Sequence, residues 1–230
     1  MKQIIYLFSL MGVFLSGCHI RVLNPKSDTA EAQSFLIYFS FGIMILVLLT
    51  VFFLLSRLVR KYRNRTGNHQ ALKHEKGNKK LEIVWTIIPV LLLTILAIPT
   101  VIVTYNQSPN QADQSGDRRE EVHINVTAEQ YQWTFIYENG KTTSGELYLP
   151  SDKTIVLHLR SKDVIHSFWV PSIGGKVDVL PHKENTMKLE NIESGVYQGK
   201  CAEFCGTNHT DMRFTTRVIS SKQFLDWLDE

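Results

Sequence analysis

The chain has 230 residues, of which 44% are hydrophobic and 20% are charged, and its formal net charge is +3. This length allows one large domain, or a membrane anchor followed by a domain of moderate size. A net charge this small, without a basic groove carrying interleaved aromatic residues, excludes nucleic acid as an expected partner. Apolar residues gather in the first half of the chain and polar residues in the second, so we expect two parts of different character.

Residues 1–17 contain one positive charge, at Lys2, and then an apolar run from Ile4 to Leu15. As a helix this run spans only about 18 Å, too short for a bilayer core of about 30 Å. It is therefore predicted to be a signal peptide. The following Leu15-Ser16-Gly17-Cys18 is similar to a bacterial lipobox, and we expect a lipid anchor at Cys18. The alternative is an uncleaved signal with a buried free cysteine.

Two long apolar segments are predicted to span a membrane. Residues 18–34 are polar and are placed outside it, and residues 35–56 form the first span. Its charge-free run of 21 residues covers about 31 Å as a helix, which is enough to cross. Residues 82–105 form the second span, in which we expect Pro89 and Pro99 to produce kinks rather than breaks.

The connection between the spans, residues 57–81, is strongly basic and contains one acid, Glu75. Its basic residues are Arg57, Arg60, Lys61, Arg63, Arg65, Lys73, Lys76, Lys79 and Lys80. Positive charge close to the ends of a span stays on the cytoplasmic side. We therefore expect a multi-pass protein of a bacterial cell membrane, with both chain ends on the outer face.

Residues 106–119 form a polar linker with turn chemistry, and residues 120–230 are predicted to be a separate all-β domain. Short alternating segments with turn residues between them are typical of a Greek-key sandwich or barrel. The expected strands are Val122–Thr127, Tyr131–Tyr137, Thr154–Arg160, Thr186–Leu189, Val196–Cys201 and Arg213–Ile219. A short helix is predicted at Lys222–Leu228.

Two cysteines, a histidine and a methionine fall within twelve residues: Cys201, Cys205, His209 and Met212. Thiolate and thioether sulfur are soft ligands and imidazole is borderline, a set that suits copper better than magnesium, calcium or manganese. Two cysteines in one loop suggest two metal ions that share sulfur bridges. A disulfide between the cysteines, or a redox C-x-x-x-C pair, are the alternatives, but neither explains the histidine and the methionine.

The pattern C-x-E-x-C-G-x-x-H-x-x-M, from Cys201 to Met212, resembles the binuclear copper (CuA) motif of cytochrome c oxidase subunit II. The upstream runs His166-Ser167-Phe168-Trp169-Val170-Pro171 and Lys176-Val177-Asp178 resemble the segment that supplies that family's other histidine. The resemblance implies a cupredoxin-like barrel after a two-helix transmembrane hairpin. It also implies a role in transferring electrons from cytochrome c to a haem in oxidase subunit I, where oxygen is reduced with proton pumping.

In this family the two thiolates bridge the copper ions, each histidine binds one ion, and the methionine sulfur and a backbone carbonyl are weak ligands. The positions of this chain that match are Cys201, Cys205, His166, His209, Met212 and, through its carbonyl, Glu203. The resemblance further implies that the Glu203 carboxylate ligates a magnesium or manganese ion at the contact with subunit I, and hard cations do prefer oxygen. The other histidines are predicted to be structural: His19, His69, His74, His123, His158 and His182.

The resemblance implies that electrons enter at Trp133, which matches the family's surface tryptophan in contact with cytochrome c. Phe135 replaces a second tryptophan found in many relatives. Glu138 and Asp163 match acidic docking positions, and such charges at a rim tune association rate more than affinity. No C-x-x-C-H motif occurs, so we expect no fused cytochrome domain and a separate cytochrome c as donor.

Three competing functions stay open at this point. The first is a quinol oxidase subunit, whose members, by the same resemblance, have lost the copper ligands. The second is the CuA domain of nitrous-oxide reductase, against which the two spans argue. The third is a membrane-tethered copper-delivery or thiol-redox protein, which needs only the cysteines and one histidine. Expected partners of the preferred function are oxidase subunit I, further oxidase subunits, cytochrome c and membrane lipid.

Overall fold

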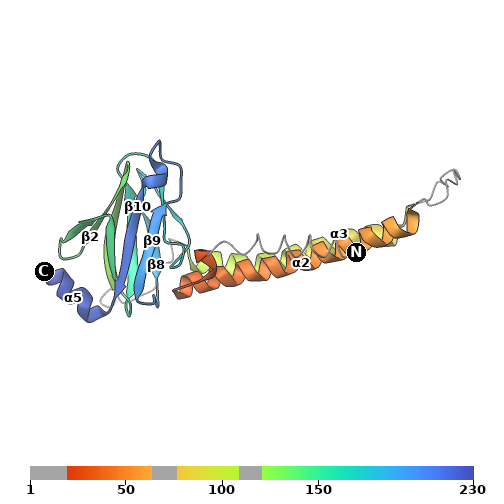
Figure 1. Ribbon diagram of the computed structural model, residues 1–230, viewed down its shortest axis with the longest axis horizontal. Coiled ribbons are helices and arrows are strands. Elements are labelled where there is room, and N and C mark those ends of the chain that lie inside the picture. The colour runs from red at the N-terminus through yellow and green to blue at the C-terminus, as the bar shows by residue number, and fades with distance from the viewer. Residues whose placement is uncertain (1–19, 64–76, 109–120) are drawn as a thin grey trace, which may run out of the picture.

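The computed structural model describes residues 20–63, 77–108 and 121–230. The predicted signal peptide, Cys18, most of the basic loop and most of the linker lie outside these ranges and stay predictions. A helical hairpin and a β-domain make up the described part, with the β-domain at one end of the hairpin (Figure 1). The expected order, a helical hairpin and then an all-β cupredoxin-like domain, is confirmed.

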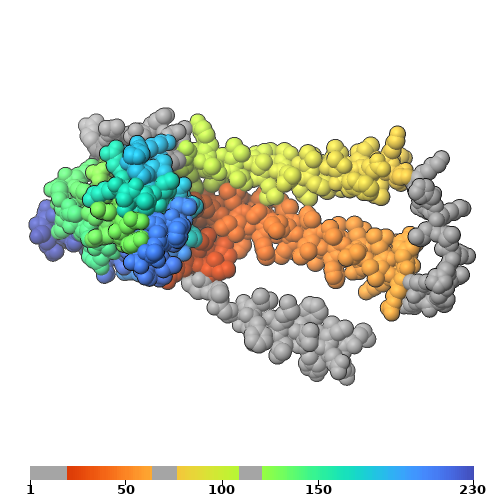
Figure 2. Space-filling view, turned by 90° about the horizontal axis from the view of Figure 1, so that it is seen from above, coloured from red at the N-terminus to blue at the C-terminus, as the bar shows by residue number. Residues whose placement is uncertain are grey.

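Helices α2 (Asp28–Tyr62) and α3 (Lys79–Asn106) are both long and apolar enough to cross a membrane. They run side by side (Figures 1 and 2) and their most apolar stretches have no buried residues, so apolar side chains face outward. Ser27 accepts a hydrogen bond from the Ala30 N–H and caps α2, which is why this helix begins within the segment expected to be polar. Helix α3 continues unbroken through its two prolines.

The start of α2 is fastened to the β-domain. The Lys26 N–H donates to the Ser172 carbonyl at 2.7 Å, and the Glu193 N–H donates to the Lys26 carbonyl at 2.9 Å. The Ser27 hydroxyl, besides capping the helix, donates to the Ile173 carbonyl. At the same end of the hairpin, Gln107 Nε2 donates to the Thr29 carbonyl at 3.1 Å and so ties the end of α3 to the start of α2. These bonds fix where the β-domain lies relative to the helices.

In the part of the chain that the structure describes, ten strands form two five-stranded sheets, which pack face to face. The first has the order β3-β2-β1-β5-β8 and the second β4-β10-β9-β6-β7. Pairing is antiparallel except for β1 with β5 and β4 with β10. The strands are β1 (Glu121–Glu129), β2 (Gln132–Tyr137), β3 (Thr142–Ser144), β4 (Glu146–Pro150), β5 (Thr154–Ser161), β6 (His166–Trp169), β7 (Val177–Val179), β8 (Asn185–Leu189), β9 (Gly195–Cys201) and β10 (Arg213–Ile219).

All six expected strands are present, and four more, β3, β4, β6 and β7, were not predicted. Strands β3 and β7 are only three residues long, too short for an alternating pattern to show. Strand β6 buries three consecutive residues instead of alternating. The predicted terminal helix is α5 (Ser221–Asp229), which starts with a capping box formed by Ser220 and Gln223.

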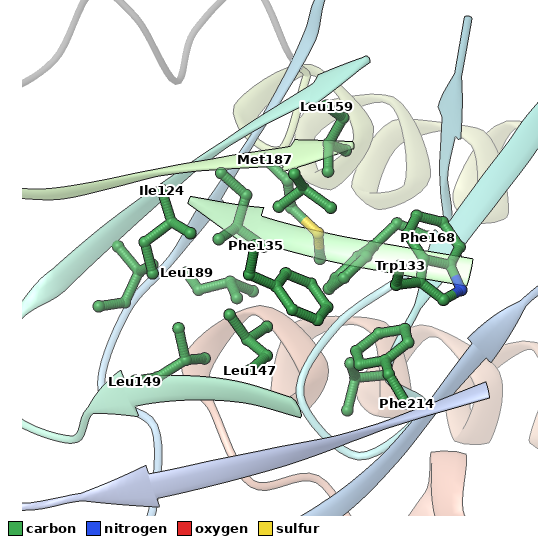
Figure 3. Close-up of a cluster of buried hydrophobic side chains, with 14 of the residues drawn as sticks. Ile124, Trp133, Phe135, Leu147, Leu149, Leu159, Phe168, Met187, Leu189 and Phe214 are labelled. Carbon is green, nitrogen blue, oxygen red and sulfur yellow. The ribbon is translucent and has the colours of Figure 1, made fainter. Parts of the chain in front are cut away.

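The core lies between the sheets and is filled by inward-pointing side chains of both (Figure 3). Its end nearest the cysteines is aromatic. The Phe168 and Phe214 rings stack with centroids 4.9 Å apart, and Trp133 packs edge-on against Phe168 at 5.6 Å. Gly199 of β9 lies opposite Phe214 of β10 in the sheet, and a Cβ at Gly199 would overlap the Phe214 ring.

We predict that Gly199→Ala destabilises the β-domain by about 1–3 kcal/mol, the usual cost of overfilling a packed core. Thermal unfolding of the full chain in detergent, followed by near-UV circular dichroism, measures this. Replacing Phe214 by Leu in the same chain should recover part of the loss. Gly42→Ala is the control, because no atom lies within 4 Å of a Cβ there. Equal melting of Gly199→Ala and the unmodified chain would contradict the packing described.

Candidate metal centre

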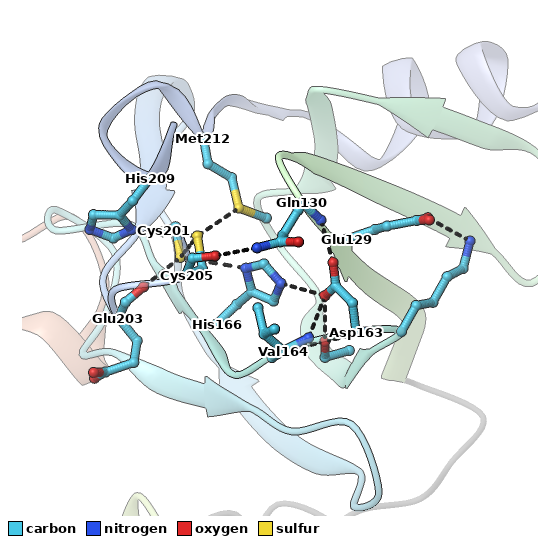
Figure 4. Close-up of polar contacts among 12 residues, drawn as sticks. Glu129, Gln130, Asp163, Val164, His166, Cys201, Glu203, Cys205, His209 and Met212 are labelled. Atoms are coloured by element: carbon cyan, nitrogen blue, oxygen red, sulfur yellow. Dashed lines mark hydrogen bonds and ion pairs between the residues drawn. The ribbon is translucent and has the colours of Figure 1, made fainter. Parts of the chain in front are cut away.

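The sulfur ligands predicted from the sequence lie on the connection between β9 and β10 (Figure 4). Cys201 is the last residue of β9, and Met212 directly precedes β10. The Cys201 N–H donates to the Met212 carbonyl at 2.9 Å, which closes the base of the loop. Within it, His209 begins the short 3₁₀ helix η2 (His209–Asp211). A neighbouring strand contributes His166, the first residue of β6, which pairs with β9.

The donor atoms of these residues converge. The two cysteine Sγ atoms are 3.8 Å apart. The Nδ1 atom of His166 lies 3.8 Å from Cys201 Sγ, and the Nδ1 atom of His209 lies 3.6 Å from Cys205 Sγ. Two further donors complete the set: Met212 Sδ is 3.7 Å from Cys205 Sγ, and the Glu203 carbonyl oxygen is 3.2 Å from Cys201 Sγ. The structure therefore brings together all six predicted ligands.

Cys201 and Cys205 are free and buried. Their separation of 3.8 Å is far longer than the S–S bond of about 2.05 Å in a disulfide. His166 and the two cysteines are the one group of three or more histidine, cysteine or acidic residues, within the described ranges, whose ligand atoms lie close enough to hold a metal ion. Two thiol sulfurs, two imidazole nitrogens, a thioether and a carbonyl oxygen fit soft or borderline metals, and copper in particular.

The two thiols differ in their proton affinity. Burial raises the pKa of Cys201, but hydrogen bonding to His166 and to the surrounding backbone outweighs it and lowers this pKa to about 6. Burial raises the pKa of Cys205 to about 11, with the neighbouring Cys201 as the second cause. The site thus readily provides one thiolate, and the second thiol requires a nearby cation to lose its proton.

Asp163 orients His166. Its Oδ1 accepts a hydrogen bond from His166 Nε2 at 2.8 Å, which leaves Nδ1 facing the cysteines. The carboxylate also accepts from the N–H groups of Gln130 and Val164, both at 2.7 Å. Burial alone would raise the Asp163 pKa, yet these hydrogen bonds hold it at about 2. Burial lowers the pKa of His166, but Cys201 and Asp163 raise it by more.

The sequence reading of Asp163 as a free docking charge missed this contact, because the carboxylate is engaged with His166. Its position three residues before a ligand histidine was the available signal. Glu138, the other expected docking acid, is exposed but follows the far end of β2. At about 3.3 Å per residue along a strand, it lies about 17 Å from Trp133, the residue of β2 that packs beneath the site. A docking role for either acid stays a prediction.

The predicted surface position of Trp133 is wrong, because its side chain is 0% exposed. Residues 133, 135 and 137 of β2 all face the core, since side chains alternate along a strand. The Trp133 ring lies beneath the site, with its centroid 6.2 Å from that of His166. The exposed aromatic residue at the site is Phe204, on the loop between the cysteines, which is 77% exposed.

Gln130 and Tyr131 hold the loop from the β1–β2 turn, a contact that the sequence did not indicate. Gln130 Nε2 donates to the Cys205 carbonyl at 2.6 Å, and the Tyr131 hydroxyl lies 3.1 Å from Thr207 Oγ1. Gly206 has φ +137° and a Cβ there would collide with the Tyr131 hydroxyl, so only glycine allows this close approach.

The Glu203 side chain points away from the sulfur atoms. Its carboxylate is 3.4 Å from Lys176 Nζ, which also lies 3.3 Å from Asp178. The expected magnesium or manganese role of this carboxylate stays a prediction.

Two family models match the chain. The model described as cytochrome c oxidase subunit II, transmembrane domain, matches residues 18–103, and the one described as its periplasmic domain matches residues 141–219. The first covers the helical hairpin and the second covers the part of the β-domain that carries every candidate metal ligand. The chain is thus a membrane protein with a C-terminal β-domain.

Curated relatives agree with the family models. The chain is 38% identical to cytochrome c oxidase subunit 2 of Alkalihalophilus pseudofirmus, over 96% of this chain and 66% of that protein. Identity is 39% with cytochrome c oxidase subunit 2 of Bacillus subtilis, over 99% of this chain and 68% of that protein. It is 34% with quinol oxidase subunit 2 of Bacillus spizizenii, over 99% of this chain and 72% of that protein. The chain spans about two thirds of the length of the first two relatives.

Among solved structures, the chain is similar to the periplasmic domain of subunit II of cytochrome oxidase of Bradyrhizobium japonicum. Identity is 29% with a TM-score of 0.45, over 47% of this chain and 91% of that one. The family models and curated relatives carry the assignment: the chain belongs to the cytochrome c oxidase subunit II family, which includes subunits of cytochrome c oxidases and of quinol oxidases.

Proposed function

We propose that this chain is the electron-accepting subunit of a bacterial haem–copper cytochrome c oxidase. It takes electrons from cytochrome c at a binuclear copper centre and passes them to a haem in subunit I, where oxygen is reduced to water with proton pumping. One observation carries the proposal: two buried free thiols lie 3.8 Å apart with an imidazole nitrogen beside each. This arrangement provides two equivalent halves for two soft ions.

In this proposal the thiolates of Cys201 and Cys205 would hold the copper ions, and His166 and His209 would each contribute an imidazole nitrogen. Met212 and the Glu203 carbonyl are the weak ligands. When bound, copper supplies the ability to gain and lose one electron. The chain supplies rigidity, because the loop is closed by backbone hydrogen bonds and its ligands project from strand ends. A rigid ligand set limits rearrangement when the charge changes.

A quinol oxidase subunit is the second candidate, favoured by the relatives that bear that name. Against it, all six donors expected of a copper centre are present and converge in this chain. A thiol-redox protein is less well supported, because both cysteines are buried. Reactive cysteines are found in partially exposed positions, where a partner thiol can reach them.

The same proposal includes the remaining partners. Cytochrome c approaches over the cysteine loop, where Phe204 is exposed, and the buried Trp133 acts as a relay beneath the surface. The copper domain faces the outer side of the membrane, opposite the basic loop. The proposal also includes a lipid anchor at Cys18. It further includes a magnesium or manganese ion held through Glu203 at the contact with subunit I.

We predict that the full chain in detergent binds two copper ions, and that Cys205→Ser loses this binuclear site because a hydroxyl cannot replace a soft bridging thiolate. Metal analysis and electron paramagnetic resonance of the copper-loaded protein measure both. Thr210→Ser, an exposed change on the same loop, should keep both ions and the spectrum. A spectrum in Cys205→Ser identical to that of the unmodified chain would refute the assignment.

We predict that Asp163→Asn lowers copper affinity by about 10–100-fold, the usual effect of removing the partner of a ligand histidine. An amide cannot accept hydrogen bonds at both of its terminal atoms, whereas the Asp163 carboxylate does so from His166 and Gln130. Competition with a copper chelator measures the affinity, and Glu138→Gln is the control. Unchanged affinity with weaker, salt-sensitive binding of cytochrome c would show instead that Asp163 is a docking residue.

We predict that Trp133→Phe slows electron uptake from reduced cytochrome c several-fold while copper content stays the same. The Trp133 ring packs edge-on against His166 beneath the site, with centroids 6.2 Å apart, so a smaller ring weakens the contact through which the proposed relay would reach this ligand. Phenylalanine is chosen because alanine would leave a large cavity in the core. Stopped-flow kinetics measure the rate, with Phe135→Leu as the control for altered core packing. If both variants slow equally, the relay role is incorrect.

A further inference from the structure

Two histidines outside the metal centre face each other on the outer surface of the first sheet. His123 lies on β1 and His158 on β5, and their neighbours Ile124 and Leu157 point into the core. His123 Nδ1 is 3.0 Å from His158 Nε2, and the two rings stack with centroids 5.3 Å apart. Nothing in the sequence pattern predicts this pairing, because the two histidines are 35 residues apart.

A carboxylate lies beside the outer nitrogen of each ring. Glu184 Oε1 is 2.9 Å from His158 Nδ1, and since an ionised carboxylate only accepts, that nitrogen carries the proton. Glu121 Oε2 is 3.8 Å from His123 Nε2, which is buried and has no hydrogen-bond partner in the structure. Without a metal, one of the two inner nitrogens donates a hydrogen bond to the other at 3.0 Å. With the proton of His123 on Nε2 instead, beside Glu121, both inner nitrogens would present lone pairs to each other, and a bound cation would satisfy both.

We propose that His123 Nδ1 and His158 Nε2 form a second metal site, for a divalent copper or nickel ion. Two nitrogens 3.0 Å apart, each about 2.1 Å from an ion, subtend an angle of about 90°. A tetrahedral zinc site needs a wider angle, whereas square-planar and tetragonal sites with nitrogen and oxygen ligands are typical of divalent copper and nickel. Water completes the coordination, because the two side chains are 23% and 20% exposed.

The charges around the pair are compatible with a bound cation. Lys188, on β8, has its Nζ 4.0 Å from Glu121 Oε1 and 3.0 Å from Glu190 Oε1. Its charge is therefore shared between two carboxylates. Glu184 and Glu121 lie outside the rings, which is the position of the carboxylates that orient ligand histidines in metal sites. None of these residues belongs to the copper centre, so the two sites are independent.

Equilibrium dialysis of the full chain against Ni²⁺ tests the proposal, using protein in detergent that carries no histidine tag. We expect His158→Asn to bind one fewer Ni²⁺ per chain than the unmodified protein. His182→Asn, which removes an exposed histidine of the same domain, should bind as much as the unmodified protein. Cys205→Ser should also keep the Ni²⁺ ion that is lost in His158→Asn, because Cys205 lies outside the histidine pair. Failure of the copper proposal can therefore be told apart from failure of the histidine-site proposal.

His123→Gln provides a second variant, and circular dichroism without metal shows that each variant is folded. Electron paramagnetic resonance of added Cu²⁺ gives a second measurement. If nitrogen hyperfine structure seen with the unmodified chain is lost in both variants, the result would support direct ligation of the ion by His123 and His158. Equal Ni²⁺ binding by His158→Asn, His123→Gln and the unmodified chain would overturn the proposal. An equal loss in His182→Asn would also overturn it, because binding would then reflect surface histidines in general.

Discussion

The pairing of β9 with β10 and β6 is the constraint on which the candidate metal centre depends. The Cys201 N–H donates to the Met212 carbonyl, so the first and last sulfur donors begin and end a loop whose base is fixed by a backbone bond. The partner of Cys201 across the sheet is Phe168, which places His166 two residues away on the same strand. Sheet register therefore positions the donors before any metal binds, and little ordering remains for binding to supply.

The aromatic end of the core sets the environment of those donors. Trp133, Phe168 and Phe214 pack beneath the cysteines and keep water from them. In such a medium an isolated thiolate is unfavourable, which is why burial raises the Cys205 pKa and why hydrogen bonds are needed to lower that of Cys201. Asp163 adds fixed negative charge behind His166. The site is thus arranged for a bound cation, and it is less suited to thiol exchange with a partner.

The attachment of α2 to the β-domain is relevant to the proposed electron transfer. Backbone bonds at Lys26 and Glu193 and the Ser27 side chain hold the domain against the end of the helical hairpin. A metal centre that exchanges electrons with a membrane-embedded partner requires a fixed distance between the centre and that partner. A flexible link between the domain and the helices would not fix this distance. The second sheet carries the proposed copper ligands, while His123 and His158 lie on the first, so the two proposed sites lie on separate sheets of the domain.

The sequence by itself determined the features that are local along the chain. Two apolar runs predicted α2 and α3, alternation predicted six strands, and the spacing from Cys201 to Met212 indicated the sulfur and histidine ligands of the loop, because a short loop keeps its residues together. His166 was added by the family resemblance. Only the tertiary structure decided which residues meet across the sheets. It buried Trp133, turned Asp163 toward His166, and paired His123 with His158. Such contacts depend on strand register between distant segments, and neither composition nor periodicity specifies that register.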